Sequence, residues 1–359
     1  MRYAILLLLL VSSTCWAAPE ITGVGSISNG SNVTITGTGF GSAPTVVFFT
    51  DFEQGSNNVD ILTGSGSANV GEITAITAGI SKYSSSAAMS GNLSFQTGME
   101  SSETGRGTVT INLPSPTDDI FMSWYLYIPL GDNYPGEGGL ESINWKPVWI
   151  LGADQTDDDL VVPVLLGDVD GTNLSWLITG NDQNPGYFKY LDVDFVKGRW
   201  ARFAVWIKGS SNNTGQCHFW VTDAVNGTIQ EANENNVTTL KSGGKRESVV
   251  INAYGRVAAD SHPTFDDVYI ATGLNARARI EIGDSSTYTE CTKFSVCTPS
   301  SWSTTSIVAT SWVAAFDEGV AYLYVTDADG AVNANGYQIT LGSGTSHKSG
   351  TGSGTGNIR

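Results

Sequence analysis

The sequence predicts an all-β protein. Glycine is abundant, with 42 residues in a chain of 359, while lysine and arginine together number only 18. Helical periodicity is almost absent, and short runs of β-branched and aromatic residues alternate with Gly, Asn, Asp and Pro. Short strands bounded by such residues are typical of β-sandwiches. A chain of this length is long enough for two domains with full hydrophobic cores.

The two ends of the chain carry two halves of one pattern. Residues 19–48 read PEITGVGSISNGSNVTITGTGFGSAPTVVF, with a Gly-x-Gly-Phe-Gly corner at residues 37–41. This segment resembles the opening of an IPT/TIG-type immunoglobulin-like domain, and residues 321–342 resemble its closing half. The resemblance implies an immunoglobulin-like β-sandwich built from residues 18–48 and 273–342. The alternative is that residues 276–341 form a small β-domain of their own.

Residues 49–272 are then a second domain inserted into the first. The insert opens with Thr50-Asp51-Phe52-Glu53 and closes with Phe265–Ile270. Both segments resemble the first and last strands of concanavalin/laminin-G-like jelly rolls, which pair side by side. That pairing suits an insertion, because entry and exit must be adjacent in space. The strands expected within the insert are 120–129, 144–152, 160–167, 174–179, 199–209, 216–222 and 248–257.

The charge and the chain ends limit the partners and the compartment. The formal net charge of −17 argues against nucleic acid, since no basic tract is present to neutralise phosphates. Residues 1–17 have the features of a secretion signal, and no other stretch is long enough to span a membrane. We therefore expect an extracytoplasmic protein, either secreted, periplasmic or at the cell surface. Residues 343–359 are rich in Gly, Ser and Thr and are expected to form a flexible tail.

The cysteines add one prediction. Cys291 and Cys297 lie six residues apart across an expected turn. In an oxidising compartment such a pair is predicted to form a disulfide.

Strand alternation sorts the residues of the insert into two faces. The core face is predicted to contain Met122, Trp124, Leu126, Ile128, Ala201, Phe203, Val205, Ile207, Cys217, Phe219, Val221, Val249 and Ile251. In the strand that starts at Asn144, Lys146 is expected on one side and Trp145 and Trp149 on the other.

The opposite face combines aromatic rings with hydrogen-bonding groups. A sugar ring stacks its C–H face on Trp or Tyr, while its hydroxyls bind fixed donors and acceptors. This face therefore predicts an extracellular polysaccharide as the partner, bound on the concave sheet of the jelly roll. The predicted carbohydrate-binding residues are Tyr125, Tyr127, Trp206, Trp220, Arg202, Asn252 and Arg256. The alternative is that the immunoglobulin-like domain or long loops cover this face.

The same residue types allow a polysaccharide lyase as a second hypothesis. β-Elimination needs a cation to neutralise the uronate carboxylate and a base to remove the C5 proton. The predicted catalytic residues for this case are His218, Tyr254, Arg202 and Lys146. The chain resembles jelly-roll polysaccharide lyases in this respect, although the R-x-E-L-R and Q-[IV]-H motifs of alginate lyases are absent.

Two further possibilities bear on catalysis. Glycoside hydrolysis needs two facing carboxylates, and the acidic pairs of the insert lie in turns or at strand edges, which disfavours it. A non-catalytic adhesive or structural surface protein is the third hypothesis.

Acidic residues at the entry and exit of the insert predict one ion. Jelly rolls of this type often join their first and last strands through calcium. Carboxylate oxygens are the ligands that Ca²⁺ prefers. The predicted ligands are Asp51, Glu53, Asp266 and Asp267. The sequence indicates no other cofactor.

Overall fold

The computed structural model describes residues 17–77, 79–98, 107–130, 144–152, 161–167, 174–180, 188–191, 198–223, 227, 229–240, 242–256 and 262–342. Within these ranges the regular structure is β, apart from one short 3-10 helix, η3 (Tyr288–Glu290). The predicted all-β fold class is therefore confirmed. No helix of these ranges is long and apolar enough to cross a membrane. The predicted signal and the predicted tail, apart from Ala17, lie outside the described residues.

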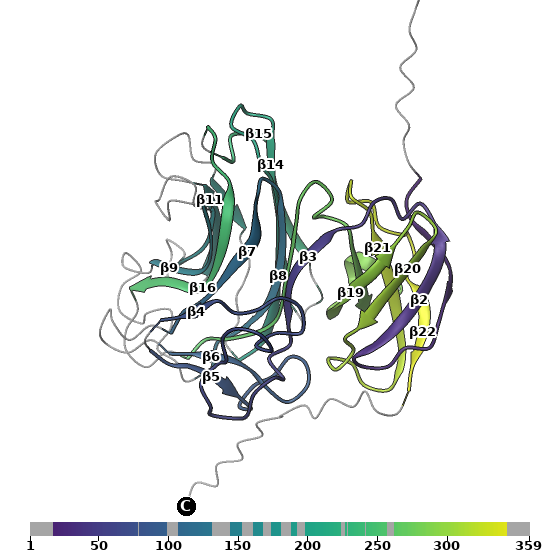
Figure 1. Cartoon of the computed structure of the whole chain (residues 1–359), viewed down its shortest axis with the longest axis horizontal. Coiled ribbons are helices and arrows are strands. Elements are labelled where there is room, and N and C mark those ends of the chain that lie inside the picture. The colour runs from purple at the N-terminus through teal and green to yellow at the C-terminus, as the bar shows by residue number, and fades with distance from the viewer. Residues whose placement is uncertain are drawn as a thin grey trace, which may run out of the picture.

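A β-domain, here called the host domain, takes strands from both ends of the chain. Strand β2 pairs with β20, so that Ile35 lies opposite Ile307. The host domain forms one sheet, in which all strand pairs are antiparallel. Its seven strands follow the order β1 (Glu20–Val24), β2 (Ser31–Thr38), β20 (Ser306–Ser311), β19 (Phe294–Trp302), β18 (Arg279–Gly283), β21 (Gly319–Thr326) and β22 (Tyr337–Leu341). In Figure 1 the early strand β2 lies beside the late strand β20.

The glycine corner at residues 37–41 turns the chain over the edge of the host core. Gly39 and Gly41 have φ values of 72° and 66°, a region that side chains with a Cβ disfavour. Phe40 between them is fully buried, and its carbonyl oxygen accepts a hydrogen bond from Trp302 Nε1 at 3.2 Å. This hydrogen bond therefore connects the N-terminal part of the host domain, which contains Phe40, to its C-terminal part, which contains Trp302.

The insert is a sandwich of two antiparallel sheets. The sheet called here the outer sheet has the order β12 (Phe188–Leu191), β11 (Leu174–Gly180), β10 (Val161–Gly167), β9 (Asn144–Gly152), β16 (Arg246–Arg256), β7 (Val109–Thr117) and β4 (Ala75–Ile76). The inner sheet has the order β15 (Ile229–Val237), β14 (Gly215–Asp223), β13 (Trp200–Lys208), β8 (Ile120–Tyr127), β17 (Thr264–Thr272), β6 (Ser94–Thr97) and β5 (Ser81–Ser84), with β3 (Thr45–Thr50) paired to β17.

Two layers cover the inner sheet, one on each face. Its predicted core residues, such as Met122, Trp124 and Phe203, are fully buried against the outer sheet. Nearly every residue of β8, β13 and β17 is buried, including those on the opposite face. The host domain covers that second face, beside β3 and β8 (Figure 1).

The strand at the predicted entry to the insert lies beside the strand at its exit. Strand β3 pairs with β17, with Phe48 opposite Ile270 and Thr45 opposite Thr272. The first and last strands of the insert are therefore neighbours, as the jelly-roll resemblance implies. The predicted boundary after residue 48 falls within β3, which pairs with β17 of the insert.

Candidate functional site

The predicted sugar-binding face of the inner sheet is an interface with the host domain. Tyr125, Arg202 and Trp206 are only 2%, 5% and 6% exposed. The Tyr125 hydroxyl donates to the carbonyl oxygen of Phe294 at 2.8 Å and accepts from the Phe294 N–H at 2.8 Å. Tyr125 and Trp200 also pack against the core of the host domain. The prediction of a sugar groove here is wrong, because the host domain fills it.

A buried ion network joins the two domains at this interface. Glu281 of β18 accepts hydrogen bonds from Arg202 Nη2, from Arg279 Nε at 2.9 Å and from the Tyr288 hydroxyl at 2.8 Å. Burial acts to raise the pKa of Glu281, but Arg279 and Arg202 lower it, and the net result is a pKa below its ordinary value. Glu281 therefore carries its charge inside the protein. Sequence reasoning does not single out Glu281, although one acid in the apolar strand RIEIG is a signal for a buried cation.

The tryptophans of this face hold an arginine rather than leaving a stacking platform. The Arg277 guanidinium lies 4.8 Å from the ring centroid of Trp206 and 5.7 Å from that of Trp220. His218 packs between the same two rings at 5.4 and 5.6 Å. Burial lowers the pKa of His218, and Arg277 lowers it further. Tyr127 is partly buried, with its ring 5.4 Å from that of Trp200.

The predicted catalytic residues divide between the two sheets. His218 and Arg202 belong to the inner sheet, whereas Lys146 and Tyr254 belong to the outer sheet. Since stacked sheets lie about 10 Å apart and their outward faces point away from each other, the four cannot form one site. The set of four predicted catalytic residues is therefore not brought together, and His218 and Tyr254 cannot serve one site as acid and base.

The outer sheet brings together the remaining members of the predicted set. In the pairing of β9 with β16, Lys146 lies opposite Tyr254 and Asn144 lies opposite Arg256. Directly opposite residues of an antiparallel pair share a face of the sheet. Of Tyr254 and Arg256 the structure describes the backbone but not the side chains.

Lys146 and Trp149 lie on the same side of β9, which corrects the alternation expected from the sequence. The Lys146 Nζ atom is 5.8 Å from the ring centroid of Trp149. The register of β9 against β10 shifts between the pairs Trp145–Leu165 and Ile150–Val161. Such a bulge adds one residue to one strand and so breaks the two-residue period.

Asn252 shapes this site from inside the sandwich. It is fully buried, and its Nδ2 donates to Thr97 Oγ1 at 2.7 Å and to the Gly107 carbonyl at 2.9 Å. Its φ of 54° coincides with the register shift of β16 between Ile251 and Tyr254. The predicted role of Asn252 in sugar contact is wrong, because its side chain anchors the bulge that sets the register of Tyr254.

The four predicted calcium ligands lie around the junction of β3 and β17. The segment Met89–Leu93 donates hydrogen bonds to three of them, Glu53, Asp266 and Asp267. Asp266 Oδ2 accepts the N–H groups of Met89 at 2.7 Å and Ser90 at 3.2 Å, and Asp267 Oδ1 accepts the Ser90 hydroxyl at 2.7 Å. Glu53 Oε1 accepts the N–H groups of Asn92 and Leu93.

The four predicted ligands Asp51, Glu53, Asp266 and Asp267 are here called the acidic corner. Among them, the hydrogen-bonding capacity of Asp267 is the least satisfied. Its Oδ2 is buried without a hydrogen-bond partner among the described residues, and its φ is 46°. Burial raises the pKa of Asp267 to about 7, and the nearby Asp51 contributes to the rise. Burial and Asp267 together raise the pKa of Asp266 well above its ordinary value.

A metal ion at the acidic corner stays a prediction. In the described part of the chain no group of three or more His, Cys, Asp or Glu side chains is arranged to hold a metal ion. Backbone N–H groups donate hydrogen bonds to both carboxylate oxygens of Asp266 and to one carboxylate oxygen of Glu53. The free oxygen of Asp267 is the feature on which a calcium site depends.

The predicted disulfide is absent. Cys291 and Cys297 are both buried free thiols. Residues Phe294–Trp302 form the continuous strand β19, so the chain does not turn back between the two cysteines. Cys297 faces the host core, while Cys291 packs with Phe294 and Tyr324.

Comparisons with known proteins report only distant likeness. No family model matches the chain. No curated protein matches it either. Among solved structures, an endo-β-1,4-glucuronan lyase from Trichoderma reesei covers 65% of this chain and 98% of its own, with 12% identity and a TM-score of 0.42. An alginate lyase from Aplysia kurodai covers 54% and 87%, with 10% identity and a TM-score of 0.39. Lectin II from Ulex europaeus covers 61% and 100%, with 10% identity and a TM-score of 0.39. Values this low transfer neither a substrate nor a residue role to this chain.

Proposed function

We propose that this protein is an extracytoplasmic polysaccharide-binding protein whose ligand lies across β9 and β16 of the outer sheet. The observation that carries the proposal is the grouping around Lys146, which contacts Trp149 and lies opposite Tyr254. An aromatic ring beside a cation suits a sugar ring that carries a carboxylate. The host domain packs on the inner sheet, so the outward face of the outer sheet is the remaining broad face of the sandwich.

The charge of the protein makes a local cation necessary for an acidic ligand. The net charge of −17 repels a polyanion, but salt limits that repulsion to about 8–10 Å at physiological ionic strength. At the site itself, Lys146 and the register position of Arg256 supply positive charge. We therefore propose a polysaccharide that contains uronate residues.

The host domain is proposed to be an IPT/TIG-like module that serves as a mount. Its support is the glycine corner at residues 37–41 and the pairing of strands from both ends of the chain. In this proposal the host domain closes one face of the insert and leaves recognition to the other.

Binding to a panel of polysaccharides tests the proposal. The panel contains polyglucuronate, alginate, polygalacturonate and a neutral β-glucan. We expect retention by at least one acidic polysaccharide, and a loss of affinity of about tenfold or more in Lys146→Ala, because a hydrogen bond to a charged group contributes about 1.5–3 kcal/mol. Trp149→Ala should also weaken binding. The matched control is Lys208→Ala, since Lys208 is an exposed lysine at the end of β13 in the inner sheet.

Two results would contradict the proposed site. One is unchanged binding in both Lys146→Ala and Trp149→Ala. The other is an equal loss in Lys208→Ala, which would indicate a general effect of charge. Absence of binding to every member of the panel would favour the third hypothesis, a structural or adhesive surface protein.

A polysaccharide lyase is the second candidate, and the register pair Lys146–Tyr254 favours it. In β-elimination the cation neutralises the uronate carboxylate while a base removes the C5 proton. The C4–O bond then breaks, its electron pair leaves with the oxygen, which takes up a proton, and a C4=C5 double bond forms. Lys146 has the chemistry for the first role and Tyr254 for the second.

Ultraviolet absorbance of unsaturated uronate separates a lyase from a binding protein. The mature protein is incubated with the same acidic polysaccharides, with and without calcium. A signal that disappears in Tyr254→Phe, while binding persists, would identify a lyase. A signal that Tyr254→Phe leaves unchanged would exclude Tyr254 as the base.

A further inference from the structure

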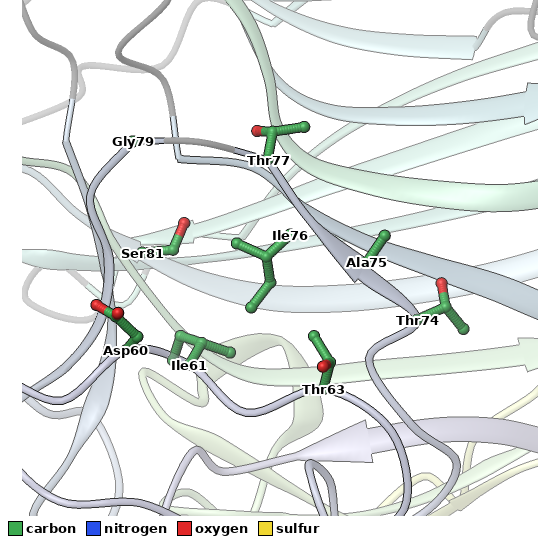
Figure 2. A pocket seen from close by; sticks show the side chains of 9 residues that line it. All are labelled: Asp60, Ile61, Thr63, Thr74, Ala75, Ile76, Thr77, Gly79 and Ser81. Carbon is green, nitrogen blue, oxygen red and sulfur yellow. The ribbon is translucent and has the colours of Figure 1, made fainter.

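A hollow at the edge of the insert is open and electrically balanced. Figure 2 shows it between the segment 60–63 and β4, with the side chain of Ile76 directed towards Ile61. Most of its lining residues are exposed, and Lys82 lies directly opposite Asp60 in a β-bridge. The more deeply buried charged groups lie elsewhere, where the insert meets the host domain.

Arg277 holds the segment that leads from the insert into the host domain. Its guanidinium lies 4.8 Å from the ring centroid of Trp206 and 5.7 Å from that of Trp220. Its Nη1 donates to the Asp329 carbonyl of the host domain at 3.1 Å, and a Cβ at Gly330 would collide with the guanidinium. A cation over an indole ring is attracted by its π-electrons. Arg277 therefore joins two tryptophans of the insert to a loop of the host domain.

His218 lies beside Arg277 on the same two rings. Its ring centroid is 5.4 Å from that of Trp206 and 5.6 Å from that of Trp220, and its side chain is 13% exposed. Burial lowers the pKa of His218, and Arg277 lowers it further. Burial and Arg279 likewise lower the pKa of Arg277. A proton on His218 would place another positive charge in a site where water screens charges poorly.

One carboxylate faces His218 from the neighbouring strand. Glu231 Oε1 lies 3.5 Å from His218 Nδ1, and Glu231 is 44% exposed, so solvent weakens its attraction for a protonated imidazole. Glu231 and the side chain of Asn235, also on β15, act to raise the pKa of His218. From the host domain the facing charge is that of Arg277, among the residues that the structure describes. Burial and Arg277 outweigh the two β15 groups, since the net pKa of His218 is lowered.

The hairpin formed by β14 and β15 carries His218 and also reaches the host domain near its tip. Ile229, at the start of β15, packs against the host cluster that contains Phe294. A Cβ at Gly227 would lie 2.8 Å from Thr292 Cγ2, so the backbone of the tip is close to the host domain. The hairpin therefore contacts the host domain both through Arg277 and at its tip.

We propose that the β14–β15 hairpin and the host domain form a pH-sensitive latch, which is closed at neutral pH and opens locally when His218 takes up a proton. Opening moves His218 away from Arg277 and allows water to hydrate both charges. The pKa of His218 is lower in the closed state, so the open state binds the proton more tightly. The open population should rise by up to about tenfold per pH unit below about pH 6.5, until the closed state is protonated as well.

Hydrogen exchange of the full chain at pH 7 and pH 5 tests the latch. Backbone exchange is followed by mass spectrometry and corrected for the intrinsic pH dependence of the exchange reaction. In peptides from β14, β15 and β18 we expect protection to fall several-fold to about tenfold between the two pH values. Peptides from β7 and β9 of the outer sheet should keep their protection. His218→Gln should remove most of the fall, because glutamine has no proton to gain.

Matched variants make the result specific to His218. Glu231→Gln should enlarge the fall, since it removes the facing carboxylate. His262→Gln should leave the fall unchanged, because His262 precedes β17 and lies outside the hairpin. Protection of the outer sheet shows in each case that the variant is folded.

Three results would overturn the latch. One is equal protection of the hairpin at both pH values in the wild type. Another is a fall of the same size in the outer sheet, which would indicate global destabilisation. The third is a full fall in His218→Gln. None of these results depends on the proposed polysaccharide site, because the latch belongs to the inner sheet and the host domain.

Discussion

Arg202 of the insert forms a buried ion pair with Glu281 of the host domain. The two residues are 79 positions apart, and they come from β13 and β18, which belong to different sheets. Arg279 completes the network from the host side. Burial lowers the pKa of Arg202, but Glu281 and the neighbouring phenols raise it above its ordinary value. The interface therefore depends on one carboxylate shared by two guanidinium groups.

Loss of that carboxylate should destabilise the whole protein. Glu281→Gln leaves Arg202 and Arg279 buried without a counter-charge, and breaking a buried pair costs about 3–5 kcal/mol. The expected result is a fall of that size in the free energy of unfolding, measured by urea denaturation. Glu318→Gln is the control, because Glu318 is exposed in the same domain and should change stability by less than about 0.5 kcal/mol. Equal stability of the two variants would contradict the role of the network.

Sequence alternation predicts the core of the insert but not what covers its second face. Met122, Trp124 and Phe203 are placed correctly, because the two-residue period of a strand is a local property. Tyr125, Arg202 and Trp206 are aromatic and cationic, and such residues suit a sugar or a domain interface equally well. Only the long-range pairing with Glu281 and Phe294 decides between the two.

The candidate site on the outer sheet shows a different limit. Lys146 and Tyr254 can be selected from the sequence by residue type, but their pairing depends on two bulges. A bulge changes the face of every later residue in its strand, and nothing in the pattern of β9 marks it. In β16 the signal is Asn252, since asparagine tolerates positive φ better than most residues.

Substitutions at Asn252 should separate its backbone role from its hydrogen bonds. Asn252→Gly keeps the positive φ but removes the bonds to Thr97 and Gly107, so we expect a loss of about 1–3 kcal/mol. Asn252→Ala also strains the backbone and should lose roughly a further 1 kcal/mol. Urea denaturation of the three proteins measures both steps. If the alanine variant is at least as stable as the glycine variant, the left-handed conformation at this position is not required.

His218 predicts a pH dependence of stability on the acidic side. Its pKa in the folded protein is lowered by burial and by Arg277, below the ordinary value of 6.5. Above about pH 6.5 the imidazole is neutral in both states. As the pH falls below that value, the unfolded chain binds a proton that the folded protein resists, so stability falls by up to about 1.4 kcal/mol per pH unit.

The variant His218→Gln should show less of this loss between pH 7 and pH 5. The relevant quantity is the difference in unfolding free energy between wild type and variant at each pH, because contributions of the buried acids Asp266 and Asp267 cancel in it. A difference that stays constant with pH would show that His218 titrates alike in both states.

Calcium removal and addition test the acidic corner between β3 and β17. The Asp267 Oδ2 atom is buried without a partner in the described part of the chain, so a cation there would gain a ligand and relieve an unpaired acceptor. We propose that calcium binds here, and we expect the melting temperature of chelator-treated protein to rise on calcium addition. At a calcium concentration 100 times the dissociation constant, the stabilisation is about 2.7 kcal/mol.

Asp267→Asn should abolish the rise, whereas Asp118→Asn, at an exposed ion pair with Lys245, should preserve it. Magnesium should have a smaller effect, since it demands a tighter octahedral geometry. A melting temperature that calcium leaves unchanged in the wild type would mean that the hydrogen bonds from residues 89–93 close this corner without an ion.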